Sequence, residues 1–272
     1  MVLLDGKKVR DEKLEELKNI IKANTLCLAV IQIGNDEASN IYINEKRKMC
    51  KYLNINFKHI LLPDNISMEE VINEIENLNN DKNVTGILLQ LPISKHLDSK
   101  VLINKIAKDK DIDGLSDLSI ANFYHNKNGI IPCTPKGILT LIDYYKINIE
   151  GKNIVIIGRS NLICKPLYHL LLNRNATVTM CHSKTANLKE FTKNADILIV
   201  AVGKPNFITE DMIKEKTIIF DCGISRTNGK VVGDVDFKSV SKKASYITPV
   251  PGGVGPMTIL SLAENIYETS LK

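Results

Sequence analysis

Residues 153–160 read Asn153-Ile-Val-Ile-Ile-Gly-Arg-Ser160, and this stretch gives the first indication of the fold class. Its apolar run has the length of a buried strand, and it leads directly through Gly158 into a segment with a helical pattern. Backbone amides at such a strand-to-helix turn can bind phosphate, as they do in dinucleotide-binding domains. The glycine spacing GxGxxG is absent, since Gly158 is the only one of its glycines present. The stretch therefore predicts a Rossmann-like unit but is a weak signal alone.

The end of the next predicted strand, residues 177–181, strengthens this interpretation. The chain continues there as Cys181-His-Ser-Lys-Thr185, where an NAD-binding protein usually has a carboxylate for the adenosine ribose. Here the chain supplies a hydroxyl and a lysine instead of an acid. Together with Arg159, these groups suit the 2′-phosphate of NADP. The alternative for Arg159 and Ser183 is a solvated pair on the surface.

The rest of the chain alternates helical and strand patterns, which predicts an α/β protein with parallel, helix-covered sheets. In the first half, helices are expected at residues 10–23, 36–53 and 67–78, the last two capped by Asp36 and Ser67, and strands at 26–33, 56–62 and 85–91. In the second half, strands are expected at 153–157, 177–181, 196–202 and 217–221. Thr134-Pro135 predicts the N-cap and first residue of a helix over 136–145, which carries the chain into the second unit.

A second unusual stretch is Thr248-Pro-Val-Pro-Gly-Gly-Val-Gly-Pro-Met-Thr258. So many glycines and prolines predict a shaped loop rather than a helix or regular strand, followed by a helix over residues 259–267. A tight turn is one explanation. A ligand-contacting loop is favoured, because the special positions exceed what a turn needs.

Composition narrows the functional class. The chain has 272 residues, long enough for two domains, and its 44% hydrophobic and 25% charged content is ordinary for a soluble globular protein. The net charge of +5 is spread along the chain, so nucleic-acid binding is not expected. The six cysteines contain no CxxC pair, which favours reduced thiols in the cytoplasm over disulfides or a zinc site. The sequence shows neither an export signal nor a membrane span.

The predicted helix over residues 36–53 carries a lysine in an apolar row, because Tyr42, Lys46, Met49 and Leu53 share one face. A lysine whose stem packs while its ammonium reaches water would explain the row. The functional alternative is a partly desolvated amine that exchanges protons near neutrality, since burial disfavours the charged form. Tyr42, one turn earlier, could stack on a flat heterocycle.

Two further features lie near predicted strand ends. Gln90 interrupts the apolar strand just before Pro92, either as a buried amide bonded to backbone or as a ligand contact. Asp109-Lys-Asp-Ile-Asp113-Gly114 imitates the start of an EF-hand, but Ile120 stands where the bidentate Glu is required, so calcium binding is rejected. An acidic turn remains, or a carboxylate offered by Asp113 to the donor edge of a guanidine-like ring.

In combination these motifs resemble the bifunctional methylenetetrahydrofolate dehydrogenase/cyclohydrolase family of one-carbon metabolism. The matching stretches occur in order along nearly the whole chain: Tyr42-Ile-Asn-Glu-Lys46-Arg-Lys, Gly86-Ile-Leu-Leu-Gln90-Leu-Pro92, Lys110-Asp-Ile-Asp113-Gly114, Pro132-Cys-Thr-Pro135, Gly158-Arg-Ser160, Cys181-His-Ser183-Lys-Thr185 and Pro249-Val-Pro-Gly-Gly-Val-Gly-Pro-Met-Thr258.

The resemblance implies a two-domain α/β enzyme, usually a cytoplasmic homodimer, that binds tetrahydrofolate derivatives in a cleft and uses NADP without a metal. The expected catalytic and folate domain spans residues 1–140 and is completed by a helix at 255–272, and the Rossmann-like NADP domain spans 141–254. The enzyme would oxidise 5,10-methylenetetrahydrofolate to the methenyl cation and hydrolyse that to 10-formyltetrahydrofolate.

The family's residue roles transfer to matching positions in this sequence. Lys46 resembles the catalytic lysine, Tyr42 the residue that stacks on the folate ring, Gln90 the partner that orients the lysine, and Asp113 the acceptor for the pterin. The other implied folate contacts are Leu89, Leu91, Pro251, Gly252, Gly253, Val254, Gly255, Pro256, Met257 and Thr258. The implied NADP contacts are Thr134, Gly158, Arg159, Ser160, Ser183 and Ile224.

One position departs from the family pattern, because Cys164 stands where a glycine usually lies two residues before the proline. A thiol there adds bulk close to the expected cofactor. Two other classes stay open at this point: another two-domain NADP-dependent oxidoreductase, such as a shikimate dehydrogenase, and a folate or nucleotide sensor without catalysis.

Overall fold

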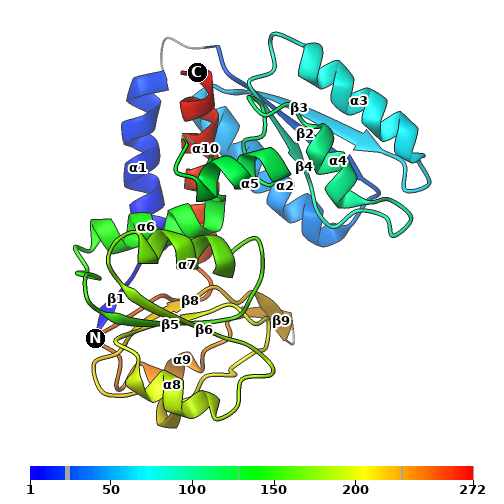
Figure 1. Cartoon of the computed structure of the whole chain (residues 1–272). Coiled ribbons are helices and arrows are strands. Elements are labelled where there is room, and N and C mark those ends of the chain that lie inside the picture. The colour runs from blue at the N-terminus through cyan, green and yellow to red at the C-terminus, as the bar shows by residue number, and fades with distance from the viewer. Residues whose placement is uncertain (22–24, 128, 228, 272) are drawn as a thin grey trace. The chain divides into compact units, whose positions relative to one another are not determined.

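The computed structural model describes residues 1–21, 25–127, 129–227 and 229–271, which fold into two compact units (Figure 1). The large-sheet unit comprises residues 1–11 and 132–258, and the small-sheet unit comprises residues 12–131 and 259–272. Helices α1 (Gly6–Ile21) and α10 (Val254–Ser270) contribute residues to both. The predicted α/β class is confirmed, whereas the functional domain boundaries expected near residues 140 and 254 stay a prediction.

The small-sheet unit contains parallel strands in the order β3-β2-β4. Its elements alternate as the sequence predicts: β2 (Cys27–Ile33), α2 (Glu37–Leu53), β3 (Asn56–Leu62), α3 (Met68–Asn80), β4 (Gly86–Leu89), α4 (Ser99–Lys105) and α5 (Asp117–Tyr124). The predicted caps are confirmed, because Asp36 accepts a hydrogen bond from the Ser39 amide and Ser67 forms a capping box with Glu70. The last residues of the helix expected over 10–23 lie outside the described residues.

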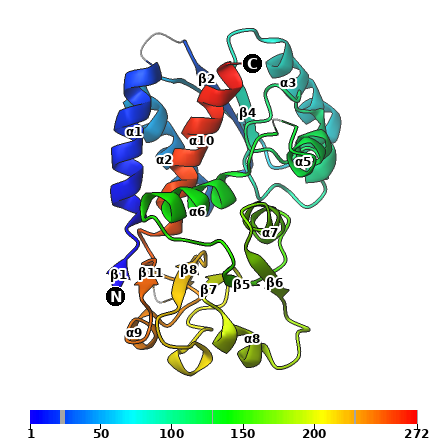
Figure 2. The same cartoon turned by 60° about the vertical axis from the view of Figure 1, so that its left-hand side comes forward.

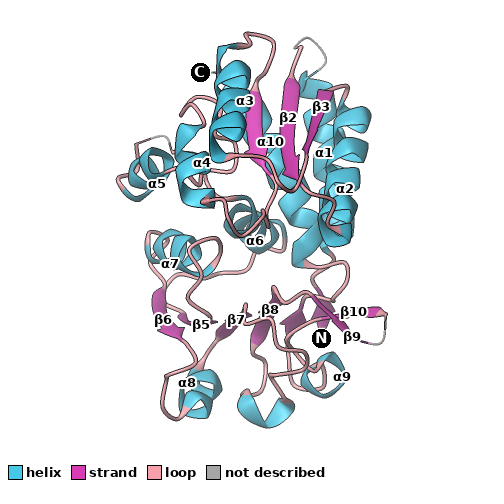
Figure 3. Ribbon diagram, turned by 90° about the vertical axis from the view of Figure 1, so that its right-hand side faces the viewer, coloured by secondary structure: helices cyan, strands magenta, loops and turns pink. Residues whose placement is uncertain are grey.

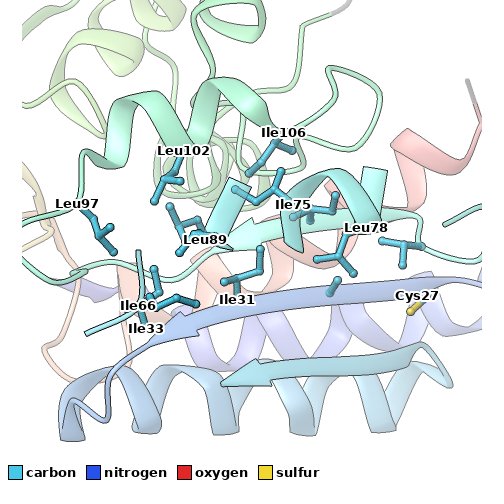
Figure 4. Close-up of a cluster of buried hydrophobic side chains, with 14 residues drawn as sticks. Cys27, Ile31, Ile33, Ile66, Ile75, Leu78, Leu89, Leu97, Leu102 and Ile106 are labelled. Carbon is cyan, nitrogen blue, oxygen red and sulfur yellow. The ribbon is translucent and has the colours of Figure 1, made fainter. Parts of the chain in front are cut away.

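The core of this unit explains why β2 reads as an unbroken apolar run. Every residue of β2 is buried, because the strand has a neighbour on each side and helices on both faces. Figure 4 shows apolar side chains of β2 and β4 meeting those of α3 and α4 in one cluster, which includes Ile31, Ile75, Leu89 and Leu102. Helix α2 packs against β2 and β3 (Figure 3).

The large-sheet unit contains parallel strands in the order β1-β11-β8-β7-β5-β6. Helices α6 and α7 lie on one face, and α8 and α9 on the other (Figure 2). The elements are β1 (Val2–Leu3), α6 (Cys133–Tyr144), β5 (Asn153–Ile157), α7 (Cys164–Leu172), β6 (Thr177–Cys181), α8 (Leu188–Asn194), β7 (Ile197–Val200), the 3-10 helix Glu210–Met212, β8 (Ile218–Asp221), the hairpin strands β9 (Ser225–Thr227) and β10 (Lys230–Val232), α9 (Phe237–Val240) and β11 (Tyr246–Ile247). This doubly wound arrangement is that of a Rossmann-like unit.

Two local predictions were wrong. Thr134 is not an N-cap, because α6 begins at Cys133 after Pro132, and Thr134 lies inside the first turn. The proline-glycine stretch is not entirely loop, because α10 begins at Val254 rather than at residue 259. Pro256 is tolerated there because backbone N–H groups in the first turn of a helix have no acceptor within the helix.

Candidate active site

The lysine row on α2 runs from the core towards the surface. Leu53 and Met49 are 1% and 4% exposed, Lys46 is half-buried, and Tyr42 is 43% exposed. Lys46 therefore lies where the apolar face of the helix ends, with its stem beside buried groups. The neighbouring thiol of Cys50, one turn later, is fully buried, and this burial raises its pKa to about 12. The thiol is therefore protonated at neutral pH.

Gln90 is the hydrogen-bond partner of Lys46. The Lys46 Nζ atom donates a hydrogen bond of 2.8 Å to Gln90 Oε1, and Gln90 Nε2 donates one of 2.8 Å to the Leu91 carbonyl oxygen. The backbone amide of Gln90 also donates to the Ile31 carbonyl oxygen, which fixes the residue at the end of β4. Because Nε2 is held by backbone, Oε1 is the atom left to face the amine. The amide is only 8% exposed, so the pair sits at the boundary between core and solvent.

The loop after α4 contains two aspartates, Asp111 and Asp113, which have different surroundings. Asp111 is 2% exposed, and its carboxylate accepts hydrogen bonds from the backbone amides of Gly114, at 3.0 Å, and Ser116, at 2.9 Å. Gly114 has a φ of +69°, which glycine adopts without strain. Asp113 is half-buried and lies between Asp111 and Gly114 in the sequence. Asp111 therefore holds the backbone of the acidic turn, and the role of Asp113 as a ligand contact stays a prediction.

Other residues of the same motif also have structural partners. The Lys110 ammonium donates to carbonyl oxygens at the end of α3, namely those of Leu78, Asn79 and Asp81, and burial lowers the pKa of this lysine. A lysine here stabilises the carbonyl end of a helix. Asn265 of α10 is fully buried, and its Nδ2 donates to the carbonyl oxygens of Ile112 and Ile131. Asn265 was not predicted as a functional residue, because its only signal in the sequence is an amide within an apolar helical pattern.

The turn after β5 is closely packed. Gly158 has a φ of +135°, and a Cβ atom at this position would lie 2.6 Å from the Ala201 carbonyl oxygen and 2.6 Å from Cys164 Sγ. Only glycine fits such a position. Ser160 Oγ accepts from the Cys164 amide at 3.3 Å, at the start of α7. The Cys164 side chain is fully buried beneath Gly158, so its extra bulk relative to glycine points into the unit.

The turn after β6 presents polar groups to solvent. Its backbone is closed by side chains, since the His182 amide donates to Thr185 Oγ1 at 2.8 Å and the Lys184 amide donates to His182 Nδ1 at 3.2 Å. Ser183, Lys184 and Arg159 are exposed. The donor set at the carboxyl ends of β5 and β6 is thus hydroxyl and cation without a carboxylate, which fits a phosphate better than a ribose diol.

The stretch from Thr248 to Thr258 is anchored within the large-sheet unit. The Lys7 amide donates to the Gly252 carbonyl oxygen at 3.0 Å, and a Cβ atom on Gly6 would lie only 1.8 Å from the Gly253 carbonyl oxygen. The hydroxyl oxygens of Thr134 and Thr258 lie 3.2 Å apart. The structure therefore brings the start of α6 and the start of α10 together, although 124 positions separate these residues.

The remaining predicted residues are placed as follows. Leu89 is buried in β4, and Leu91 is half-buried. Ile224 follows β8 and is 50% exposed, which is unusual for a large aliphatic side chain. Their ligand contacts stay predictions, as do those assigned to Pro251, Gly252, Gly253, Val254, Gly255, Pro256 and Met257.

Within the described ranges, no cluster of three or more histidine, cysteine or acidic side chains could hold a metal ion. All six cysteines are free thiols, and five of them are buried. In the part of the chain that the structure describes, no helix has both the length and the apolar character needed to cross a bilayer.

These features define a two-unit α/β protein with a dinucleotide-type turn in one unit and a lysine-amide pair in the other. Family models agree: the tetrahydrofolate dehydrogenase/cyclohydrolase catalytic domain matches residues 4–113, and the NAD(P)-binding domain of the same family matches residues 132–272. The chain therefore belongs to the tetrahydrofolate dehydrogenase/cyclohydrolase family.

Individual relatives are similar over their whole length. The bifunctional protein FolD of Clostridium novyi is 50% identical over 98% of both chains. The crystal structure of the bifunctional FolD methylenetetrahydrofolate dehydrogenase/cyclohydrolase from Campylobacter jejuni has a TM-score of 0.96 and 44% identity, covering 100% of this chain and 99% of that one. The FolD of Trypanosoma brucei, solved with NADP cofactor and an inhibitor, has a TM-score of 0.92 and 30% identity, covering 99% of this chain and 97% of that one.

Proposed function

We propose that this chain oxidises 5,10-methylenetetrahydrofolate to 5,10-methenyltetrahydrofolate with NADP and then hydrolyses the methenyl group to give 10-formyltetrahydrofolate. The carrying observation is the family membership along the whole chain, with the Lys46–Gln90 pair intact. Membership in this family distinguishes the enzyme from the shikimate dehydrogenase class, and the lysine argues against a sensor without catalysis.

The residues at the carboxyl ends of β5 and β6 fit NADP. The Gly158 turn would approach the pyrophosphate, and Arg159 and Ser183 would hold the 2′-phosphate, because cationic and hydroxyl donors suit phosphate oxygens. Thr134, Ser160 and Ile224 are the other proposed contacts. When bound, NADP supplies the hydride acceptor, and the protein's part is to hold the two flat rings in contact.

The second reaction needs a base beside a cation. The methenyl carbon is electrophilic, so water attacks it and loses a proton, and opening of the ring leaves the formyl group on N10. Lys46 is the proposed group that accepts or relays this proton, and the bond from its Nζ to Gln90 Oε1 fixes its position. Tyr42, 43% exposed one turn away, offers a face for the folate ring.

Asp113 is the proposed acceptor for the donor edge of the pterin. The carboxylate of Asp111 is already occupied by backbone amides, so it supports the turn rather than the ligand. Folate contacts from residues 251–258 also belong to this proposal. The proposal also includes a homodimeric assembly and a cytoplasmic location. The six free thiols support the cytoplasmic location.

The test is a paired assay of the purified full chain. Absorbance in the NADPH band and methenyl-folate formation would be recorded with NADP and then with NAD. We expect both signals to rise together with NADP and the methenyl signal then to fall as water attacks. Absence of hydride transfer to either cofactor would contradict the proposal.

A further inference from the structure

Two buried aspartates in the large-sheet unit have no role in the chemistry described above, yet they organise much backbone. Asp221, at the end of β8, is 3% exposed, and Asp234, after β10, is fully buried. Each carboxylate accepts hydrogen bonds from three backbone amides: those of Gly223, Asp234 and Val235 for Asp221, and those of Val202, Gly203 and Lys204 for Asp234. A buried charge is tolerated when such donors surround it.

Asp234 holds the loop after β7. Its Oδ2 accepts from the amides of Val202, at 2.7 Å, and Gly203, at 2.9 Å, while its Oδ1 accepts from that of Lys204, at 2.7 Å. Gly203 has a φ of +66°, so the three amides converge on one carboxylate through a turn that glycine permits. Gly203 and Lys204 are both exposed, so the loop is held from its buried side by the Asp234 carboxylate.

Asp221 holds the segment that carries Asp234. Its Oδ1 accepts from the amides of Gly223, at 2.9 Å, and Asp234, at 3.0 Å, and its Oδ2 accepts from that of Val235, at 2.9 Å. Glycine at 223 is required by this packing, because a Cβ atom there would lie 2.2 Å from Asp234 Cγ. The two carboxylates therefore form one connected support for the loops after β7 and β8.

These loops lie at the edge that the proposed cofactor uses. Strands β5, β7 and β8 are parallel neighbours, so their carboxyl ends meet at one edge, where open α/β sheets bind ligands. A Cβ atom at Gly158 would lie 2.6 Å from the Ala201 carbonyl oxygen, so the β5 turn packs closely against the loop after β7. The β8 loop carries Ile224, a proposed NADP contact.

We propose that Asp221 and Asp234 are positioning residues that fix the loops after β7 and β8 in the shape that receives NADP, without contacting it. The inference rests on the proposed function, because the edge binds this cofactor only if the chain uses it. Loops that are ordered before the ligand arrives lose less conformational freedom on binding, so the support raises affinity.

The first test uses the unaltered protein. Hydrogen exchange of residues 202–204 and 223 would be measured with and without NADP. We expect slow exchange of these amides already without cofactor, because the carboxylates hold them. Exchange as fast as in an unstructured peptide before NADP is added would overturn the inference, whatever any variant does.

The second test substitutes Asp234→Asn, which keeps the shape but turns an amide group towards one of the backbone donors. We expect the dissociation constant for NADP, measured by calorimetry, to rise about 10- to 100-fold, because a hydrogen bond to a charged group is typically worth a factor of this size. The KM for NADP should rise more than kcat falls, and the stabilisation of thermal unfolding by NADP should shrink.

A matched control is Asp196→Asn at the opposite end of the same sheet. Asp196 also accepts from a backbone amide, that of Asn153 at 2.9 Å, and from Lys214 Nζ at 2.6 Å. Its substitution should lower the melting temperature without changing NADP affinity. Equal NADP affinity in both variants would overturn the inference. A wild-type chain that neither binds NADP nor transfers hydride would instead remove the proposed function, and the inference with it.

Discussion

Replacing Lys46 by Met should nearly abolish methenyl-folate hydrolysis while the protein still binds folate. Methionine keeps the apolar stem of the lysine and removes the amine that lies 2.8 Å from Gln90 Oε1. Loss of a positioned acid or base typically lowers a rate by about 10² to 10⁴, which corresponds to roughly 3 to 5 kcal/mol of activation free energy. Gln90 Oε1 would also lose a donor in a site that is 8% exposed, at a cost of about 1 to 3 kcal/mol in folding stability.

The two effects separate in the assay. Hydrolysis is followed by the decay of methenyl-folate absorbance, and stability by urea unfolding, because a variant that stays mostly folded cannot lose a hundredfold in rate through instability alone. Lys48→Met is the control on the same helix, since this exposed lysine forms an ion pair with Glu45 at 2.7 Å, and exposed pairs are worth about 0 to 1 kcal/mol. If Lys46→Met hydrolyses the substrate at the wild-type rate, or no more slowly than Lys48→Met, the amine is not the catalytic group.

Three further substitutions test other parts of the site. Asp113→Ala should weaken folate binding by about 1 to 3 kcal/mol, because a pterin donor loses its acceptor, whereas Asp111→Ala should mainly lower the melting temperature. A dissociation constant for folate that calorimetry finds unchanged in Asp113→Ala would contradict this prediction. Arg159→Ala combined with Ser183→Asp should reduce kcat/KM for NADP far more than for NAD at low salt, and an equal loss with both would mean that the 2′-phosphate site lies elsewhere. Burial, with a smaller contribution from the charge of Asp234, raises the pKa of Asp221 from 3.8 to about 6. Between pH 4 and 6 the Asp221 carboxyl group therefore stays protonated in the folded protein, whereas in the unfolded chain it has lost its proton. The contribution of Asp221 to the free energy of unfolding is therefore complete below pH 4 and is lost as the pH rises through 6, a loss of about 3 kcal/mol. We therefore expect the unfolding free energy of the wild type minus that of Asp221→Asn to fall over this pH range. A difference that stays constant in urea titrations from pH 4 to pH 7 would contradict that linkage.

The fold could be predicted mainly where local signals and burial agree. The caps Asp36 and Ser67 each act on an amide three residues later, so sequence spacing alone reveals them. The start of α10 could not be placed this way, because the glycines and prolines before Thr258 favour a loop locally. Tertiary packing decides there: a Cβ atom on Gly137 of α6 would lie 2.6 Å from Met257 Cβ, so the first turn of α10 is held against α6.

The candidate site shows a different limit. A lysine row on α2 and an amide at the end of β4 were visible in the sequence, but their 2.8 Å contact depends on strand register and could be inferred only through resemblance. Asp221 and Asp234 gave no signal, because their partners are backbone amides, whose positions no side-chain pattern encodes. Residues that support backbone are therefore the hardest to find from sequence, even when they are fully buried acids.

Two of the turns that carry proposed ligand contacts use this kind of support. In the turn after β6, the side chains of Thr185 and His182 accept hydrogen bonds from backbone amides, and Ser183 is exposed. In the loop after α4, Asp111 accepts hydrogen bonds from backbone amides, and the nearby Asp113 is the proposed ligand contact. Substituting Thr185, which supports the β6 turn, should therefore change NADP affinity through the shape of the turn, with Ser183 still in place.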